Sequence, residues 1–449
     1  MATKKISQLT AATVSAGTEE LLINDGGTSK KITIATATAD KLPLAGGTMT
    51  GTIAGFTSTG IDDNATSTAI TIDANNNVSF ANYILYSEPY GVSFNQSTDV
   101  YTTLGSPAIN SALPIQSRMK RCLLADNGTV SAYLSATDST LLADGGAATL
   151  DGTAGQVMVE IPKFYTKHTF ASSIHSWEIS EVPLSGFTIH PAFIKNNVEV
   201  NHRYIGAYEA SSASSVMGSV SGSTPAASKT RTTFRAEASA RGTGWRQADY
   251  YLHSAIQLLY LTEYKDFNSQ EMIGLGRTTL SGGVWTTASY IGISGKSNSD
   301  GNGTNSNDSS TLGGDAYMTY RGIENFWGNM WEMRDGWTVN DVSSSQLIMY
   351  ATNNDSDFAD TGSTNMTVIY DDTAPHATGG YVKELADIST GFLGTEMTAA
   401  SNTYVGDYYY QYAGGSGWSL PIVSTAADIG PQAGAFALFV HAASSYSSV

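Results

Sequence analysis

The chain has 449 residues, of which 40 are acidic and 23 basic, and its formal net charge at pH 7 is −17. Only 14% of its residues are charged and 45 are glycine, so most of its polar surface must consist of hydroxyl and amide groups. An acidic chain without a stripe of lysine and arginine argues against nucleic-acid binding. The single cysteine, Cys122, excludes an internal disulfide and a cysteine-based zinc site. The longest apolar stretch, around Gly434–Ala443, is too short to cross a bilayer, so we expect no membrane insertion.

Two short hairpins are predicted near the N-terminus. Glu20–Ile23 and Ser29–Ile34 flank the turn sequence Asn-Asp-Gly-Gly, and Ala69–Asp73 and Val78–Phe80 flank three asparagines. Neither hairpin can bury a core alone, and intertwined copies of the chain would protect the exposed strand edges. We therefore expect this part of the chain to form an attachment segment and an oligomeric stalk.

The composition changes beyond about residue 111, where aromatic residues become frequent. Gln156–Ile161 has the pattern of a strong strand, and Trp245–Tyr264 has apolar residues at three- and four-residue steps, which predicts a helix with one apolar face. The remaining sequence is rich in loops with short strands, which is typical of a compact α+β domain. The Ser/Asn/Asp/Gly-rich tract Gly295–Gly314 predicts a flexible surface loop.

These features predict three parts of the chain. They are an attachment segment (1–40), a β-rich stalk and oligomerisation region (41–110), and an α+β domain with few helices and many loops (111–449), whose first part (111–165) is a leading β subregion.

Motifs that would carry chemistry are scarce. The seven histidines form no HExxH pattern, and no G-x-S-x-G nucleophile motif occurs. Asp300–Asn305 loosely matches a calcium loop but lacks the glycine at the sixth position, so we expect no cofactor and no metal, with calcium as the alternative. No catalytic residue stands out. The paired carboxylates of a glycan-cleaving enzyme are brought together by the fold rather than by sequence spacing, so that class stays open.

One motif resembles a known family. The segment Tyr320–Gly336 contains Trp-Gly-Asn-Met-Trp-Glu at residues 327–332, which resembles the Gly-Asn-Val-Trp-Glu-Trp signature of the formylglycine-generating-enzyme version of the C-type lectin fold. The resemblance implies a C-type lectin-like domain over residues 111–449. Enzymes of that family are expected to use a cysteine pair or a histidine cluster, so oxidase chemistry is not expected here. The resemblance then implies structural roles for Trp327, Asn329, Trp331 and Glu332, and we expect a structural role for Trp418 as well.

The N-terminal segments Lys5–Leu9 and Leu42–Gly51 are similar to those of phage tail fibres. The resemblance therefore implies a tail-fibre receptor-binding protein located in the virion. It also implies a homotrimer that contacts other tail or baseplate proteins through its N-terminus.

The C-terminal region predicts the binding face. Thr403–Tyr412 and the Gly-Gly-Ser-Gly-Trp sequence that follows resemble the terminal variable region of phage tropism determinants. Independently, five tyrosines within residues 404–412, among Gly, Ser, Asp and Gln, have the composition of an antibody paratope. In an extended strand Tyr409 would point away from its tyrosine neighbours. The candidate receptor-binding residues are Tyr404, Asp407, Tyr408, Tyr410, Tyr412, Ser416 and Tyr446.

The leading hypothesis is therefore an adhesin that recognises a host-cell surface glycan or protein without catalysis. Two alternatives remain: a tail-associated polysaccharide depolymerase, and a purely structural tail or baseplate protein whose tyrosines lie in the core.

Overall fold

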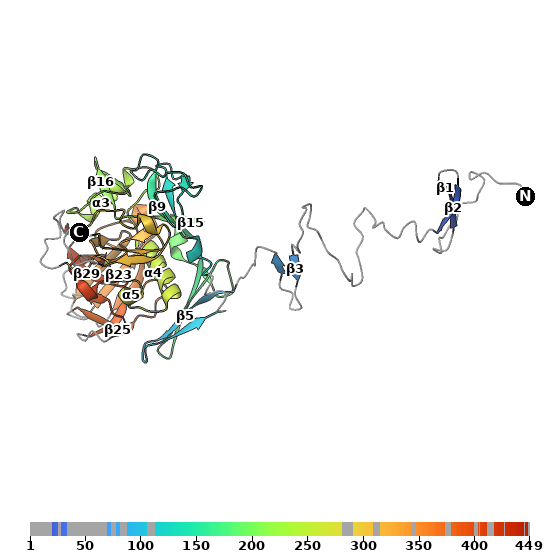
Figure 1. Ribbon diagram of the computed structural model, residues 1–449. Helices are drawn as coiled ribbons and strands as arrows, with labels where there is room; N and C mark the ends of the chain where they lie inside the picture. Colours follow the sequence, from blue (N-terminus) through green and yellow to red (C-terminus); the bar gives the residue numbers. More distant parts are fainter. Residues whose placement is uncertain are drawn as a thin grey trace, which may run out of the picture. The chain divides into compact units, whose positions relative to one another are not determined.

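The computed structural model divides the chain into two units, residues 1–85 and 86–449 (Figure 1). The residues that it describes are 20–25, 28–33, 70–72, 78–80, 88–105, 113–280, 291–308, 315–343, 346–372, 379–398, 403, 405–410, 417–425, 427–443 and 445–447.

The first unit contains the two predicted hairpins. β1 (Glu20–Asp25) pairs antiparallel with β2 (Thr28–Thr33), and β3 (Ile70–Ile72) pairs antiparallel with β4 (Val78–Phe80). Only residues 26 and 27 separate β1 from β2. Both are glycine, the residue that most readily adopts the positive φ angles of a two-residue hairpin turn. Both hairpin predictions are confirmed, whereas the oligomeric stalk stays a prediction.

Two sheets form the first half of the second unit. A five-stranded sheet has the order β12-β10-β11-β5-β6, and a four-stranded sheet has the order β15-β9-β7-β8. The strands of the first are β5 (Tyr90–Asn95), β6 (Val100–Leu104), β10 (Tyr165–Ala171), β11 (Ile174–Ser180) and β12 (Thr188–Ile189). Those of the second are β7 (Lys120–Leu124), β8 (Val130–Tyr133), β9 (Gln156–Pro162) and β15 (His202–Gly206), and β9 is the strand expected at Gln156–Ile161. β5 and β6 fall within the range 41–110 of the predicted stalk, yet they pair into a sheet of the second unit.

A nine-stranded sheet dominates the second half. Its order is β24-β23-β22-β28-β29-β27-β25-β26, with β21 paired to β28. These strands are β21 (Trp331–Met333), β22 (Trp337–Ser343), β23 (Gln346–Ala351), β24 (Thr367–Asp372), β25 (Gly380–Leu385), β26 (Gly394–Thr398), β27 (Tyr408–Tyr410), β28 (Gly417–Ser424) and β29 (Leu438–Ala443). Smaller sheets are formed by β13 (Ile194–Lys195) with β14 (Val198–Glu199), by β16 (Ser211–Ala213) with β17 (Val216–Gly218), and by β18 (Asn305–Asn307), β19 (Tyr317–Tyr320) and β20 (Ile323–Glu324).

The described residues contain three α-helices: α3 (Arg231–Ser239), α4 (Tyr250–Tyr264) and α5 (Ser269–Met272). The predicted helix corresponds to α4, but it begins five residues later than expected because Asp249 caps it and accepts a hydrogen bond from Leu252 N at 2.9 Å. Lys265 ends it in the left-handed conformation, with φ of 57°.

The helix α4 is buried on every side, not on one face as predicted. Every residue from Tyr250 to Thr262 is buried, within a hydrophobic core that includes residues of the five-stranded and nine-stranded sheets. The buried Asp249 pairs with Arg203 at 2.8 Å and Lys195 at 3.1 Å. Burial opposes ionisation of this carboxyl, but these two cations hold its pKa below the ordinary value.

The expectation of an α+β fold is wrong. The described residues are 39% strand and 14% helix and contain a sheet curled as a half-barrel, so the fold is β-rich. The strands were missed because most are short and several are interrupted by bulges, as between Asp341 and Ser343 in β22. Such interruptions break the two-residue alternation on which a strand is recognised in a sequence.

The predicted flexible loop at Gly295–Gly314 is also corrected over residues 295–308. Gly295 N donates to Glu324 Oε1 at 2.8 Å and Ser297 N donates to Glu324 Oε2 at 2.7 Å. Arg121, which is fully buried, donates to Ser297 Oγ at 2.6 Å. In the sequence these small polar residues suggest mobility, but in the structure they donate and accept hydrogen bonds with buried charged side chains. Residues 309–314 lie outside the described part.

Candidate binding face and pocket

The nine-stranded sheet has two unlike faces, and β27 shows the difference most clearly. Tyr409 is fully buried in the main core, together with Val382 of β25 and Leu438 of β29. Its neighbours Tyr408 and Tyr410 are only half-buried and project from the opposite face, as the period of an extended strand requires. The predicted alternation of these tyrosines is therefore confirmed over the three residues of β27.

Half-buried aromatic side chains on the outer side of the sheet form two groups of contacting rings, which Tyr408 and Tyr410 of β27 place next to each other. The Tyr381 and Tyr408 ring centroids are 5.4 Å apart, the Tyr410 and Phe439 rings stack at 4.3 Å, and the Phe439 and Trp331 rings meet edge to face at 5.0 Å. We name these five residues the outer aromatic face. The strip crosses neighbouring strands because β27 pairs with both β25 and β29.

A small second core supports this strip. Met333, Leu420 and Ile422 are buried beside it. Trp331 and Phe439 of the outer aromatic face pack against this cluster, as do Phe234 and Tyr446. Trp418 also projects from the outer side of β28, where its ring lies 5.8 Å from that of Tyr350. The aromatic rings are thus held by packing on a sheet, so they offer a large contact area at a small cost in conformational entropy.

The candidate receptor-binding residues lie in different environments. Tyr408, Tyr410 and Tyr446 lie on or beside the outer aromatic face. Asp407 does not: it is 2% exposed and its Oδ2 accepts a hydrogen bond from Phe436 N at 2.7 Å. Burial raises the pKa of this carboxyl well above its usual value.

The placement of Asp407 is a correction to the sequence interpretation, because a buried carboxyl that holds backbone has no surface to offer a receptor. Tyr404, Tyr412 and Ser416 lie outside the described residues.

The residues expected to be structural also differ in burial. Trp327 is fully buried and Asn329 is 3% exposed, in keeping with structural roles. Trp331, Glu332 and Trp418 are instead half-buried. Trp331 and Trp418 lie on the outer side of the sheet, and Glu332 lines the pocket described next.

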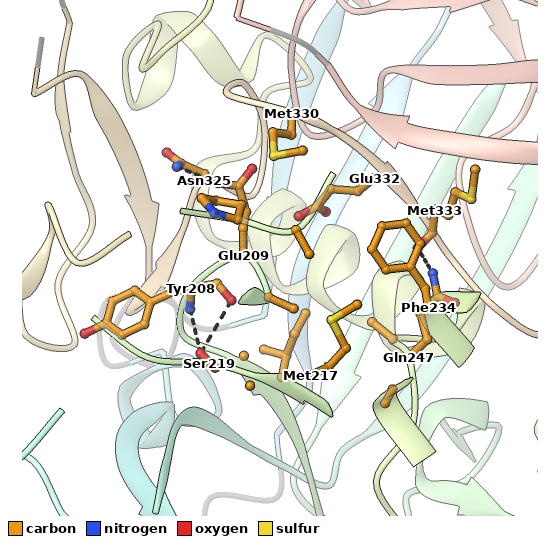
Figure 2. Close-up of a pocket in the computed structure, with 18 of the residues that line it drawn as sticks. Tyr208, Glu209, Met217, Ser219, Phe234, Gln247, Asn325, Met330, Glu332 and Met333 are labelled. Carbon is orange, nitrogen blue, oxygen red and sulfur yellow. Dashed lines mark hydrogen bonds between the residues drawn. The ribbon is translucent and has the colours of Figure 1, made fainter. Parts of the chain in front are cut away.

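A pocket opens beside Trp331 (Figure 2). Its volume is about 200 Å³, and its walls come from the segment between β15 and β17, from α3, from the residues before α4, and from the 323–334 segment. The apolar lining includes Met217, Phe234, Met330 and Met333. Because Trp331 belongs to both, the pocket lies next to the outer aromatic face.

Glu209 supplies the most unusual group of the pocket. Its Oε2 accepts hydrogen bonds from the side-chain amides of Asn325, at 3.1 Å, and Asn329. Both asparagines have a positive φ, 55° and 60°, a left-handed conformation that asparagine tolerates better than most residues. Burial raises the pKa of the Glu209 carboxyl well above its usual value, and the nearby Glu332 carboxylate raises it further, against the two amide donors.

The other polar groups of the pocket are held by neighbours. Glu332 forms an ion pair with Arg334, whose Nε lies 3.4 Å from Nδ1 of the buried His253. Burial lowers the pKa of His253 well below its usual value, and the adjacent guanidinium lowers it further, so this imidazole is neutral. Gln247 Nε2 donates to Met333 O at 2.8 Å. Figure 2 shows Glu332 extending toward Glu209 across the pocket.

Sequence reasoning missed Glu209, Gln247 and Phe439. They come from separate segments and carry no local motif. The fold alone brings Glu209 and Gln247 into one pocket and places Phe439 between the rings of Tyr410 and Trp331. One signal was available for the pocket: the Trp-Gly-Asn-Met-Trp-Glu motif contributes Met330, Trp331 and Glu332 to its lining.

The described residues contain no group of three or more His, Cys, Asp or Glu side chains placed to hold a metal ion. Asp300, of the calcium-like loop, accepts hydrogen bonds from Asn305 Nδ2 at 2.8 Å and Tyr317 Oη at 2.6 Å. Within the same described part, no helix is long and apolar enough to cross a bilayer. A scan against models of protein families and a search of curated proteins each find no match to this chain.

Proposed function

We propose that this protein is a phage tail-fibre receptor-binding protein that recognises a host-cell surface molecule, without catalysis, through the outer aromatic face. The observation that carries the proposal is the strip of half-buried rings from Tyr381 to Trp331, which lies on the outer side of a sheet whose inner side is fully packed. Tyrosine and tryptophan are favoured at recognition surfaces because each combines a rigid apolar ring with a polar atom.

The division of the chain agrees with this proposal. The described residues of 1–85 form two hairpins, and those of 86–449 form the larger sheets, the core and the aromatic strip. We propose that the first unit attaches the protein to other tail or baseplate proteins and joins three copies. Three copies would raise a weak single-site affinity, because the second and third contacts become intramolecular. An oligomer that resists SDS on an unboiled gel would support the trimer, and a clean monomer would count against it.

The test is adsorption of the purified full-length protein to cells of a host strain. We expect Tyr408→Ala/Tyr410→Ala to reduce adsorption at least about tenfold, since hot-spot aromatic side chains each contribute about 2 kcal/mol or more. The matched control is Tyr133→Ala/Tyr165→Ala, which removes two half-buried tyrosines from other sheets. Adsorption that survives in the folded double variant would overturn the proposed face. No adsorption of the intact protein on any host strain would favour a purely structural tail protein.

A polysaccharide depolymerase is the second candidate, and one observation favours it. Glu209 and Glu332 share one pocket in unlike surroundings, the first buried and the second paired with Arg334. Glycoside hydrolysis needs a protonated acid and an ionised carboxylate on either side of the scissile bond. Shortened host polysaccharide after incubation would support this candidate, and unchanged chain length with intact binding would contradict it.

A further inference from the structure

We propose that His168 and His175 form a pH-sensitive contact that holds residues 386–393 against the five-stranded sheet at neutral pH and releases them in acid. These residues connect β25 to β26 in the nine-stranded sheet, and we call them the β25–β26 connection. The inference concerns a conformational change of the second unit, and it does not depend on the proposed function.

Two buried histidine rings carry the argument. His168 of β10 is the cross-strand partner of Trp177 of β11. Phe170 pairs in the same way with His175, so all four rings lie on one face of the sheet. His168 Nε2 lies 3.1 Å from His175 Nδ1, and both histidine rings stack near the Trp177 ring. His175 is fully buried and the His168 side chain is 4% exposed, so neither ring is open to bulk water.

The geometry limits the number of protons that the pair can hold. A hydrogen bond between the two facing nitrogens needs one donor and one acceptor, whereas a histidinium ring has two N–H donors and no acceptor. One extra proton is tolerated, because His168 Nδ1 lies 3.7 Å from Asp387 Oδ1. A second extra proton, on His175 Nδ1, would turn two N–H groups toward each other and place two positive charges side by side. The contact is therefore incompatible with a doubly protonated pair.

The charges around the pair do not offset a second proton. Among the described residues, Asp387 is the one charged group that faces either ring. Lys167 of β10 and Glu178 of β11 lie on the opposite face of the sheet, where they pair with each other at 3.0 Å. The neighbouring strand β5 places Phe94 opposite His175. A charge on His175 would therefore stay in an apolar layer without a carboxylate beside it.

The pKa values of the two histidines agree with this geometry. The pKa of His175 is lowered to about 4, first by burial and then by the adjacent His168, against the Leu385 backbone. Burial also lowers the pKa of His168, and the Asp387 carboxylate opposes that shift. A solvated histidine has a pKa of about 6.5, so the contact contributes its full stability above that pH and loses it as the pH falls toward 4.

The β25–β26 connection closes this layer on the side of the nine-stranded sheet. Leu385 N, just before the connection, donates to Gln96 Oε1 at 3.0 Å, and the Phe392 ring lies 5.4 Å from that of Trp177. The Asp387 side chain is 64% exposed, so the connection borders solvent. Because the connection belongs to no strand of the five-stranded sheet, it can move without breaking that sheet. Its movement is therefore the route by which charged histidine rings reach water.

The test is hydroxyl-radical footprinting of the full-length protein from pH 7 to pH 4, with oxidation of Trp177 as the readout. Trp177 is 3% exposed, and we expect it to become accessible when the connection moves. Because opening takes up a proton on His175, the open fraction, and with it the oxidation rate, should rise about tenfold per pH unit below about pH 6.5. Trp337, which is buried in the nine-stranded sheet, is the internal control and should keep its rate.

Two variants prevent double protonation while they keep a hydrogen bond between the two positions. His168→Gln/His175→Asn places amide groups near the two facing ring nitrogens, so Trp177 should stay protected at pH 4. His168→Gln alone leaves one titratable ring, and its amide can turn its oxygen toward a protonated His175. This single variant tests the inference even where the double variant fails to fold. His202→Gln, at an exposed histidine, is the matched control and should respond to acid as the parent does.

Three results would overturn the inference. The first is an oxidation rate of Trp177 that stays constant in the parent down to pH 4. The second is an equal rise in the parent and in His168→Gln. The third is a simultaneous rise at Trp177 and Trp337, which would mark global unfolding rather than release of the connection.

Discussion

The two faces of the nine-stranded sheet are both rich in aromatic residues, yet they differ in what the rings contact. On the inner face, Tyr409 and Trp337 are enclosed by the core around α4. On the outer face, Tyr408 packs against the Tyr381 ring and Tyr410 stacks on the Phe439 ring, and both remain half-buried. The comparison teaches that aromatic content alone does not identify a binding surface. What distinguishes the outer side is that its rings pack against one another and yet stay partly exposed.

The largest expected effect comes from truncating the inner face. Tyr409→Ala should lower the free energy of unfolding by about 3–5 kcal/mol, because it leaves a cavity in a packed core. Tyr408→Ala, one residue away, should cost no more than about 1.5 kcal/mol because its ring is half-exposed. Denaturant unfolding monitored by tryptophan fluorescence measures both.

Tyr409→Phe is the matched control for this comparison. The Tyr409 hydroxyl is buried without a hydrogen-bond partner among the described residues, so its removal should be neutral or stabilising. Equal losses for Tyr408→Ala and Tyr409→Ala would show that the two faces do not differ as described.

A second substitution disturbs the outer face without truncating a ring. A Cβ atom added at Gly379 would lie 2.5 Å from Tyr410 Cδ2 and 2.7 Å from Tyr408 Oη. Gly379→Ala should therefore displace both rings at a cost of about 1–2 kcal/mol, because the rings can rotate away. We expect weaker adsorption to host cells with a modest loss of stability. Unchanged adsorption would mean that the exact placement of the two rings is not needed.

The smallest expected effect concerns the pocket and its pH dependence. A carboxyl whose pKa is raised in the folded state stabilises the fold fully below its unfolded pKa, about 4.3 for glutamate, and loses this contribution as the pH rises through the folded value. Glu209→Gln should remove that loss, so the free energy of unfolding of the variant should increase relative to that of the parent as the pH rises. Thermal unfolding from pH 4 to pH 8 measures it, and parallel curves for the two proteins would contradict the raised pKa.

Local features of the chain were predictable from the sequence. The Asn-Asp-Gly-Gly turn predicted the first hairpin, and the alternation of the tyrosines predicted which of Tyr408, Tyr409 and Tyr410 would differ in burial. Both features depend on interactions between residues near one another in the chain. Composition and hydrophobic period were therefore sufficient to predict them.

The pocket and the fold class depend on contacts between distant segments. Glu209 meets Asn325 and Asn329 more than a hundred residues further along the chain, and no pattern near Glu209 signals this. Asp407 sits among tyrosines of the predicted binding segment, yet its carboxyl turns inward to Phe436 N. A β-rich fold was missed for a related reason, because short strands are recognised through their partners rather than through their own sequence.

The most direct test of the outer aromatic face is hydroxyl-radical footprinting of the full-length protein, free and bound to host cells. The account predicts that oxidation of Tyr408, Tyr410 and Trp331 falls on binding, while Tyr133 and Tyr165, which are also half-buried but lie in other sheets, keep their oxidation rates. Protection confined to Tyr133 or Tyr165, with no change at Tyr408 and Tyr410, would contradict it.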